Sequence, residues 1–234
     1  MGMERKYAVI VAGGAGLRAG GEVPKQFQML EGLPVVWWSI KAFYDEDPDV
    51  KIIVVLHPGF FDLWDILYSE LPREIQKIDV ELVCGGRSRL ESVKNGISRV
   101  DTKDNDALIA VHDAARPLIT AEMITRGWRM AAEKGCAVPV MPMSDSLREL
   151  TADGSVAVDR SRYVRVQTPQ IFKVRELQEA YGQALTDRMT DDASVMESTG
   201  HSIYLYEGEE ANFKITKPVD FILASALLKE RMRK

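Results

Sequence analysis

Cysteine and histidine are scarce in this sequence: its 234 residues include two cysteines and three histidines. The cysteines, Cys84 and Cys136, form no C-x-x-C pair, and the histidines show none of the spacings typical of metal ligands. A disulfide framework and a structural zinc site are therefore disfavoured. Long apolar runs are also lacking, and none approaches the length of a membrane span.

An excess of positive charge is missing as well. The formal net charge is −5 and the isoelectric point is about 5.4. Such a composition does not attract nucleic acid or an anionic membrane, so an anionic ligand must be met by a local cluster of arginine and lysine. The first apolar run, residues 7–12, is too short for the core of a signal peptide. These absences predict a cytoplasmic globular protein that binds neither nucleic acid nor membrane.

The sequence instead alternates short apolar blocks with longer amphipathic ones. The short blocks are rich in β-branched residues and predict buried strands at residues 6–12, 51–57, 80–84, 107–112 and 136–141. Segments with helical spacing lie between them, at residues 34–44, 60–70, 89–99 and 121–134. The repeated β-α-β order predicts an α/β fold with a Rossmann-like, mostly parallel sheet and helices on both faces. In such sheets, ligands bind at the carboxyl ends of the strands.

The pattern changes after residue 142. Residues 146–160 alternate apolar and polar side chains around Asp153-Gly154, a dipeptide suited to a tight hairpin turn. Because an isolated hairpin is marginal in water, we expect a projecting β-arm that packs on a second copy of the chain. A hairpin folded back on its own sheet is the alternative.

After the arm, the sequence predicts helices at 174–185, 191–199 and 219–232, and strands near 202–206 and 213–215. We expect a single domain over residues 1–234, with the arm as a subdomain at about 143–161.

The most informative stretch is AVIVAGGAGLRAGGEVPKQF, residues 8–27, in which an apolar strand leads into a glycine-rich loop. Glycines after a strand let the backbone approach a ligand closely, which indicates a phosphate. Backbone N–H groups together with two cations, Arg18 and Lys25, suit phosphoryl or nucleotidyl transfer, where negative charge gathers on phosphorus oxygens. A solvated lysine in a surface loop is the alternative for Lys25.

The same loop also satisfies the relaxed dinucleotide pattern G-x-G-x-x-[GA], from Gly14 to Ala19. A dinucleotide-binding oxidoreductase is disfavoured, because Gly20, Gly21 and Pro24 would fall inside the required helix and no carboxylate ends the second strand. A Walker A loop is excluded because the sequence has no Gly-Lys-Ser/Thr at this place.

Seven motifs carry a resemblance that extends over essentially the whole chain. AGGxGxR with PKQF is followed in order by CGGRSRLESV, VHDAARP, VDR, QTPQIF, TDDAS and NFKIT. Together they resemble the 2-C-methyl-D-erythritol 4-phosphate cytidylyltransferase family of the non-mevalonate isoprenoid pathway. The resemblance implies a fold of the nucleotidyltransferase or glycosyltransferase-A type, and transfer of CMP from CTP to a small polyol phosphate with release of pyrophosphate.

The resemblance also implies which residues meet CTP. Arg18, Lys25 and Lys214 would be the catalytic cations at the reacting phosphates. Gly86 and Ser92 would surround the cytosine. The expected CTP-binding set is completed by Ala12, Gly13, Gly14, Ala15, Gly16 and Ala114.

Asp113, at the end of the fourth strand, is the candidate ligand for Mg²⁺, which prefers one or two carboxylates together with phosphate oxygens. A salt bridge between Asp113 and Arg116 is the structural alternative. The resemblance implies that the second substrate is bound by Asp113, Arg116, Ser146, Arg160 and Thr190. It further implies a homodimer, in which Arg160 and Ser146 reach the partner subunit's active site through an exchanged arm.

Two other functions remain open at this point. Ribitol-5-phosphate cytidylyltransferase has similar chemistry, and a non-catalytic nucleotide-binding protein could share the fold. The second would have lost the cations or Asp113, all of which are present. Arg87 and Arg89 are expected to be solvated and receive no role.

Overall fold

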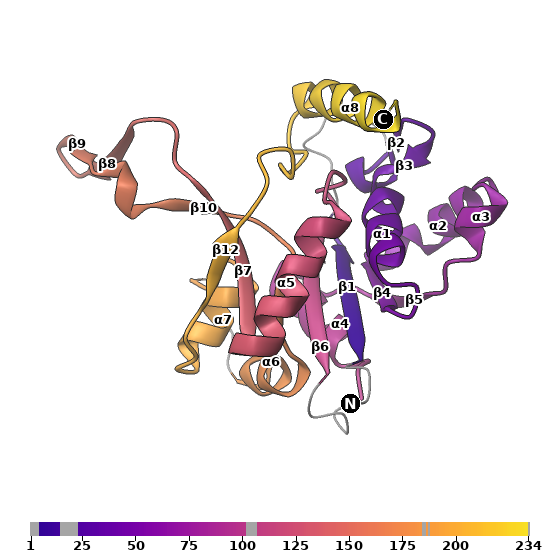
Figure 1. The fold of residues 1–234 in the computed structure, drawn as a ribbon, viewed down its shortest axis with the longest axis horizontal. Coiled ribbons are helices and arrows are strands. Elements are labelled where there is room, and N and C mark those ends of the chain that lie inside the picture. The colour runs from indigo at the N-terminus through magenta and orange to yellow at the C-terminus, as the bar shows by residue number, and fades with distance from the viewer. Residues whose placement is uncertain (1–4, 15–22, 102–106, 184–185, 187, 234) are drawn as a thin grey trace.

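A central sheet covered by helices on both faces forms the body of the molecule in the computed structural model (Figure 1). The structure describes residues 5–14, 23–101, 107–183, 186 and 188–233. The strand order in the sheet is β10-β7-β11-β6-β1-β4-β5, with β12 paired to β7. These strands are β1 (Lys6–Ala12), β4 (Lys51–Leu56), β5 (Val80–Cys84), β6 (Leu108–Asp113), β7 (Cys136–Pro142), β10 (Val164–Val166), β11 (Gln170–Lys173) and β12 (Leu205–Glu207).

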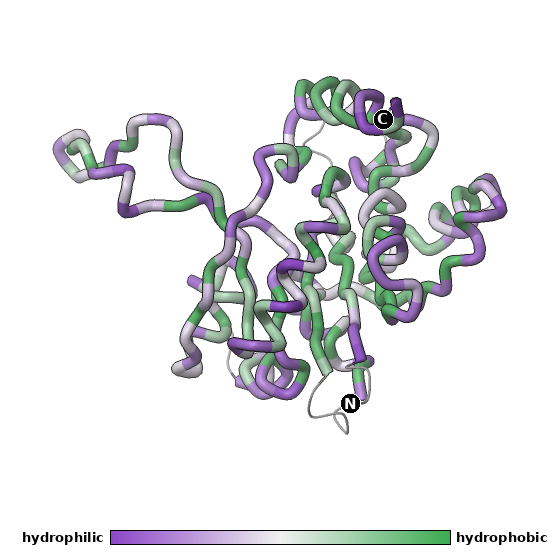
Figure 2. Tube along the Cα trace, in the orientation of Figure 1, coloured by the Kyte–Doolittle hydropathy of each residue, from purple (hydrophilic) through white to green (hydrophobic). Residues whose placement is uncertain are grey.

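The sheet is mostly parallel, as the β-α-β order predicts. β1 lies between β4 and β6 and is parallel to both, and β5 continues the parallel part next to β4. β11 is antiparallel to both of its neighbours, β6 and β7. β1, β4 and β6 are continuous apolar runs because both of their faces are covered (Figure 2). β5 is only partly buried, because it lies at the edge of the sheet, and the prediction of a buried strand at residues 80–84 is wrong in that respect.

Alternate residues of β1 enter two different cores. Ala8 and Ile10 pack with helices α1 and α5 on one face, whereas Val9 packs with α4, α6 and α7 on the other. The helices are α1 (Val35–Glu46), α2 (Phe61–Ser69), α3 (Arg73–Gln76), α4 (Arg89–Ile97), α5 (Ala121–Lys134), α6 (Val174–Tyr181), α7 (Asp192–Ser198) and α8 (Pro218–Met232). Short 3-10 turns are η2 (Lys25–Phe27), η3 (Pro58–Phe60) and η4 (Arg160–Arg162). A small hairpin, β2 (Met29–Leu30) and β3 (Leu33–Pro34), precedes α1.

The predicted arm is a hairpin that projects from the body (Figure 1). Its strands, β8 (Leu147–Thr151) and β9 (Gly154–Val158), pair only with each other among the described residues. Gly154 has φ 144°, a backbone conformation that favours glycine at the turn. The alternative of a hairpin folded back on its own sheet is therefore wrong.

The structure corrects several predicted boundaries. Residues 213–215 do not form a strand, although the N–H of Ile215 donates a hydrogen bond to the carbonyl oxygen of Ala115 at 2.8 Å. The sequence interpretation also missed β10 and β11, because each has too few residues to show a period of its own. Helix α6 ends at Tyr181, before the predicted residue 185. Among the described residues, no helix has both the length and the apolar character needed to cross a bilayer.

Candidate active site

Three loops with candidate residues follow the carboxyl ends of β1, β5 and β6. The loops after β1 and β5 touch each other: a Cβ atom added at Gly13 would lie 2.9 Å from Ser92 Oγ and 3.9 Å from the Cα atom of Gly85. Such close contact requires glycine and explains its presence at both ends of the contact. The structure thus brings Gly13, Gly86 and Ser92 into one region, as the resemblance implies.

Ser92 holds the loop after β5. Its Oγ accepts a hydrogen bond from the Gly86 N–H at 3.1 Å and donates one to the carbonyl oxygen of Ser88 at 2.8 Å. Ser88 caps α4 by accepting from the N–H of Glu91. A Cβ atom at Gly86 would come within 2.3 Å of Glu91 Cβ, so only glycine fits there. Ser92 is buried and shapes this loop through its hydroxyl group.

Lys25 lies in η2, directly after Pro24. Its Nζ donates a hydrogen bond to the carbonyl oxygen of Ile215 at 2.7 Å. The next residue, Gln26, is buried and donates to the carbonyl oxygens of Ala12 at 2.9 Å and Gly14 at 2.8 Å. The interpretation of Lys25 as a solvated surface residue is therefore wrong. Sequence reasoning gave Gln26 no role, although its place beside Lys25 in PKQF was a signal for one.

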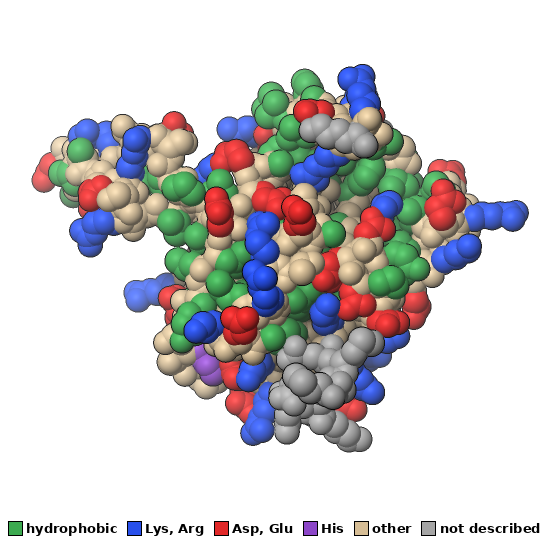
Figure 3. Space-filling view, in the orientation of Figure 1, with side chains coloured by type: hydrophobic (Ala, Val, Ile, Leu, Met, Phe, Trp, Pro, Cys, Tyr) green, Lys and Arg blue, Asp and Glu red, His purple; other side chains and the backbone are tan. Residues whose placement is uncertain are grey.

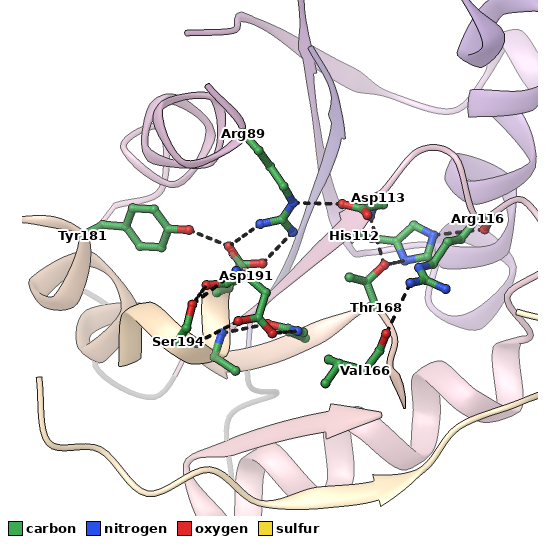
Figure 4. A network of polar contacts seen from close by, with 12 residues as sticks. Arg89, His112, Asp113, Arg116, Val166, Thr168, Tyr181, Asp191 and Ser194 are labelled. Atoms are coloured by element: carbon green, nitrogen blue, oxygen red, sulfur yellow. Dashed lines mark hydrogen bonds and ion pairs between the residues drawn. The ribbon is translucent and has the colours of Figure 1, made fainter. Parts of the chain in front are cut away.

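Asp113, at the end of β6, has a cation at each carboxylate oxygen, and Figure 4 shows the contact with Arg89. Its Oδ1 accepts from Arg89 Nε at 3.1 Å, and its Oδ2 accepts from Lys214 Nζ at 2.6 Å. Its backbone N–H donates to Thr168 Oγ1. Burial by itself would raise the pKa of Asp113, but the charges of Arg89 and Lys214 outweigh burial and hold the pKa well below its ordinary value. Asp113 is therefore ionised at neutral pH.

Arg89 is a partly buried member of this site, and the expectation that it is solvated is wrong. Its guanidinium also forms a two-point contact with Asp192, from Nη1 to Oδ1 at 3.2 Å and from Nη2 to Oδ2 at 2.8 Å. Burial opposes its charge, but Asp192 and Asp113 raise the pKa of Arg89. Arg87, in contrast, is exposed, and its backbone N–H donates to Glu91 Oε2 at 2.7 Å.

Tyr181 completes the buried network. Its hydroxyl group donates to Asp192 Oδ1 at 2.5 Å. Burial and the adjacent carboxylate raise the pKa of Tyr181, so the phenol stays protonated and keeps donating. Nothing in the sequence pattern pointed to Arg89, Asp192 and Tyr181 as a group, because Arg89 and Asp192 are 103 positions apart.

Arg116 does not form the expected alternative salt bridge with Asp113. Its Nη1 donates to the carbonyl oxygen of Asn212 at 2.7 Å, and its Nη2 lies 3.4 Å from that of Val166. His112 lies beside it, with Nε2 3.2 Å from the carbonyl oxygen of Arg116. Burial lowers the pKa of His112 to about 4, so the ring is neutral near pH 7.

The remaining candidates lie apart from this cluster or outside the described residues. Ser146 and Arg160 are exposed on the projecting arm, where Arg160 donates to the carbonyl oxygen of Ser144. Within one chain the arm extends away from the carboxyl ends of the parallel strands (Figure 1). Thr190 is exposed just before Asp191, the residue that caps α7. Ala15, Gly16 and Arg18 lie outside the described residues.

The charged groups at this edge of the sheet suit the binding of a divalent metal only when a nucleotide binds with it. No group of three or more His, Cys, Asp or Glu side chains that could hold a metal ion occurs among the described residues. Mg²⁺ does not need such a group when it binds with a nucleotide, because phosphate oxygens and water supply most of its ligands. One ionised carboxylate at the carboxyl edge of the sheet, Asp113, fits that requirement.

A mostly parallel α/β sheet carries Lys25, Lys214 and the ionised Asp113 beside the carboxyl ends of its strands. This arrangement suits a nucleotidyltransferase. The family model for IspD, 2-C-methyl-D-erythritol 4-phosphate cytidylyltransferase, matches residues 7–230. The chain belongs to this family. It is a cytidylyltransferase that transfers CMP from CTP to 2-C-methyl-D-erythritol 4-phosphate in the non-mevalonate pathway of isoprenoid biosynthesis.

Individual relatives agree with this assignment. The chain is 41% identical over 224 residues to a 2-C-methyl-D-erythritol 4-phosphate cytidylyltransferase of Bacteroides thetaiotaomicron, covering 96% of this chain and 100% of that protein. It is 43% identical over 227 residues to one of Porphyromonas gingivalis, covering 96% and 98%. The crystal structure of the Thermus thermophilus enzyme of that name has a TM-score of 0.73 at 30% identity, covering 97% of this chain and 100% of that one.

These findings confirm the predicted fold class, family and reaction. They set aside the dinucleotide oxidoreductase, the ribitol-5-phosphate cytidylyltransferase and the non-catalytic binding protein as functions of this chain.

Proposed function

We propose that Arg18, Lys25 and Lys214 are the catalytic cations of the transfer reaction, and that Asp113 holds Mg²⁺ with the phosphates of CTP. The observation that supports this proposal is the segment 212–215. Its Lys214 reaches Asp113, and the carbonyl oxygen of Ile215 accepts from Lys25. Residues 212–215 thus contact both Lys25, which follows β1, and Asp113, which ends β6.

The chemical demand of the reaction matches these charges. The phosphate of 2-C-methyl-D-erythritol 4-phosphate attacks the α-phosphorus of CTP, the new phosphorus–oxygen bond forms, and pyrophosphate leaves with the electron pair of the broken bond. The attacking phosphate is already ionised at neutral pH, so the protein supplies no general base. Its task is to overcome the repulsion between two anions and to hold them in line. A bound Mg²⁺ ion would supply further positive charge at the phosphates.

The CTP-binding role is assigned to the loops after β1, β5 and β6. Backbone groups of the first loop would cradle the phosphates, and Gly86 with Ser92 would border the cytosine. The complete proposed set is Ala12, Gly13, Gly14, Ala15, Gly16, Gly86, Ser92 and Ala114. The close contact between Gly13 and Ser92 supports a single continuous binding surface from phosphate to base.

We assign binding of the acceptor substrate to Asp113, Arg116 and Thr190 of one subunit, together with Ser146 and Arg160 of a second subunit. The projecting arm supports this arrangement, because apolar side chains are exposed on it (Figure 3). Among them are Leu150, 85% exposed, and Val156, 48% exposed. A homodimer with exchanged arms would cover them and bring Arg160 to the partner's site. We further propose one domain over residues 1–234, with the arm at about 143–161 as its subdomain, acting in the cytoplasm.

The test is pyrophosphate release from CTP and Mg²⁺ in three parallel reactions, with 2-C-methyl-D-erythritol 4-phosphate, with ribitol 5-phosphate and without an acceptor. Release with the first alone is expected. Each reaction is repeated with EDTA, because metal-independent release would contradict the role given to Asp113. Equal release with ribitol 5-phosphate would contradict the acceptor assignment.

A further inference from the structure

A buried polar network lies behind Asp113, and the transfer reaction as described does not use it. It consists of Tyr181, Asp192 and Arg89, which come from the end of α6, the start of α7 and the start of α4 (Figure 4). The side chain of Asp192 has no exposed surface, and Tyr181 is 1% exposed. These three side chains connect three helices that cover one face of the sheet to the end of β6.

The contacts in the network form a chain from Tyr181 through Asp192 and Arg89 to Asp113. Tyr181 donates to Asp192 Oδ1, and the two carboxylate oxygens of Asp192 hold Nη1 and Nη2 of Arg89. The third nitrogen of the Arg89 guanidinium, Nε, donates to Asp113 Oδ1 at 3.1 Å. A planar guanidinium held at two points cannot rotate freely, so its third contact is fixed in place as well.

Stability is a poor explanation for such a network. Removing charges from water costs free energy that their attraction often fails to return, and apolar side chains of similar volume usually serve a core equally well. The network does have a definite effect on Asp113: it occupies Oδ1 and prevents the carboxylate from turning. Oδ2 is thereby left facing Lys214, whose side chain is 40% exposed.

We propose that Tyr181 and Asp192 are positioning residues for nucleotide binding and transfer, and that they act through Arg89. They keep Oδ1 of Asp113 immobile through Arg89. Oδ2, which contacts Lys214 in this structure, is thereby the oxygen presented to the metal–nucleotide complex. This inference rests on the proposed role of Asp113. Groups that orient a metal ligand in this way typically contribute 10–100-fold in metal affinity or activity.

The experiment measures the dissociation constant of CTP by calorimetry, once with Mg²⁺ and once with EDTA, for the full chain and three variants. In Tyr181→Phe and Asp192→Asn we expect the affinity gained by adding Mg²⁺ to fall about 10-fold or more, while the affinity in EDTA stays unchanged. The matched control is Tyr206→Phe. Tyr206 is also buried, and its hydroxyl group donates to the carbonyl oxygen of Met123 at 3.4 Å, outside the network.

A purely structural network would give another result. Loosening of the fold would lower the melting temperature and would weaken CTP binding with and without Mg²⁺ alike, or would leave both unchanged. Either outcome in Tyr181→Phe overturns the inference. Asp192→Asn removes a buried charge and is more prone to misfold than Tyr181→Phe. If Asp192→Asn does not fold, Tyr181→Phe alone decides the question.

Failure of this inference and failure of the proposed site are distinguishable. Asp113→Asn is measured alongside. If Mg²⁺ strengthens CTP binding in the wild type and Asp113→Asn abolishes that gain, the site stands, and an undiminished gain in Tyr181→Phe overturns the positioning role alone. If Mg²⁺ gives the wild type no gain, the role of Asp113 is wrong and the inference is overturned with it.

Discussion

Lys25 donates a hydrogen bond of 2.7 Å to the carbonyl oxygen of Ile215, although the two residues are 190 positions apart. Ile215 is fully buried, and its N–H is bound to the carbonyl oxygen of Ala115. The lysine is therefore held against a fixed point in the segment that also carries Lys214. This contact joins the first and last motifs of the sequence into one site.

Lys25→Ala is expected to lower kcat by about 10²–10³, the loss typical of removing one preorganised donor to a transition state. The fold should be retained, because the lysine is only half-buried. The measurement is steady-state pyrophosphate release, with circular dichroism to verify folding. Lys77→Ala, at an exposed lysine after α3, is the matched control. Near-normal turnover in Lys25→Ala would contradict its catalytic role.

Asp113→Asn is expected to destabilise the fold at pH 7 by about 3 kcal/mol, since it leaves partly buried Arg89 with one charged partner fewer. For a chain of this size, that corresponds to a fall in Tm of about 6–12 °C. The sign with pH follows from the lowered pKa of folded Asp113. The stability that ionised Asp113 contributes is fully present above about pH 4, which is the pKa of an aspartate in the unfolded chain. This contribution is lost as the pH falls toward the pKa of Asp113 in the folded protein.

The check is urea unfolding of wild type and Asp113→Asn at a series of pH values. The difference in unfolding free energy should be largest near pH 7 and should shrink below about pH 4. Asp65→Asn, at an exposed position in α2, provides the control. A difference that grows on acidification would show that the folded pKa of Asp113 is not lowered.

Gly86→Ala is expected to weaken CTP binding by about 10-fold or more, because the new methyl group would lie 2.3 Å from Glu91 Cβ and force the loop after β5 to move. Calorimetric titration with CTP measures the effect. In Gly59→Ala the nearest atom to the new methyl group is 3.4 Å away, in the ring of His57, which is ordinary contact. That control should bind CTP like the wild type, whereas equal affinity in both variants would exclude the loop from the site.

Arg160→Ala tests the exchanged arm. We expect this variant and Lys25→Ala each to be inactive as pure preparations. In a mixed dimer, one site would combine both defects and the other neither. Random mixing at equal amounts should therefore restore about a quarter of the wild-type sites. An equimolar mixture that stays inactive after subunit exchange, or a chain that sediments as a monomer at micromolar concentration, would rule out a partner-supplied Arg160.

Much of this protein was determined by local sequence. The apolar β-branched runs specified β1, β4 and β6, because burial on both faces leaves a continuous pattern within a few residues. The Asp153-Gly154 turn specified the hairpin of the arm. The motifs from the glycine loop to NFKIT specified the family and its reaction, because the residue types in each motif suit one chemical task.

Only the tertiary structure decided how these parts meet. No local period distinguishes exposed Arg87 from partly buried Arg89, which lies two positions later at the start of α4. Asp192 is brought to Arg89 by the packing of α7 against the sheet face that α4 also covers. Likewise, residues 213–215 are held at the site by contacts to Ala115 and Lys25 rather than by strand pairing. Such contacts between distant residues depend on how whole elements pack, and packing is a property of the folded chain rather than of any short segment.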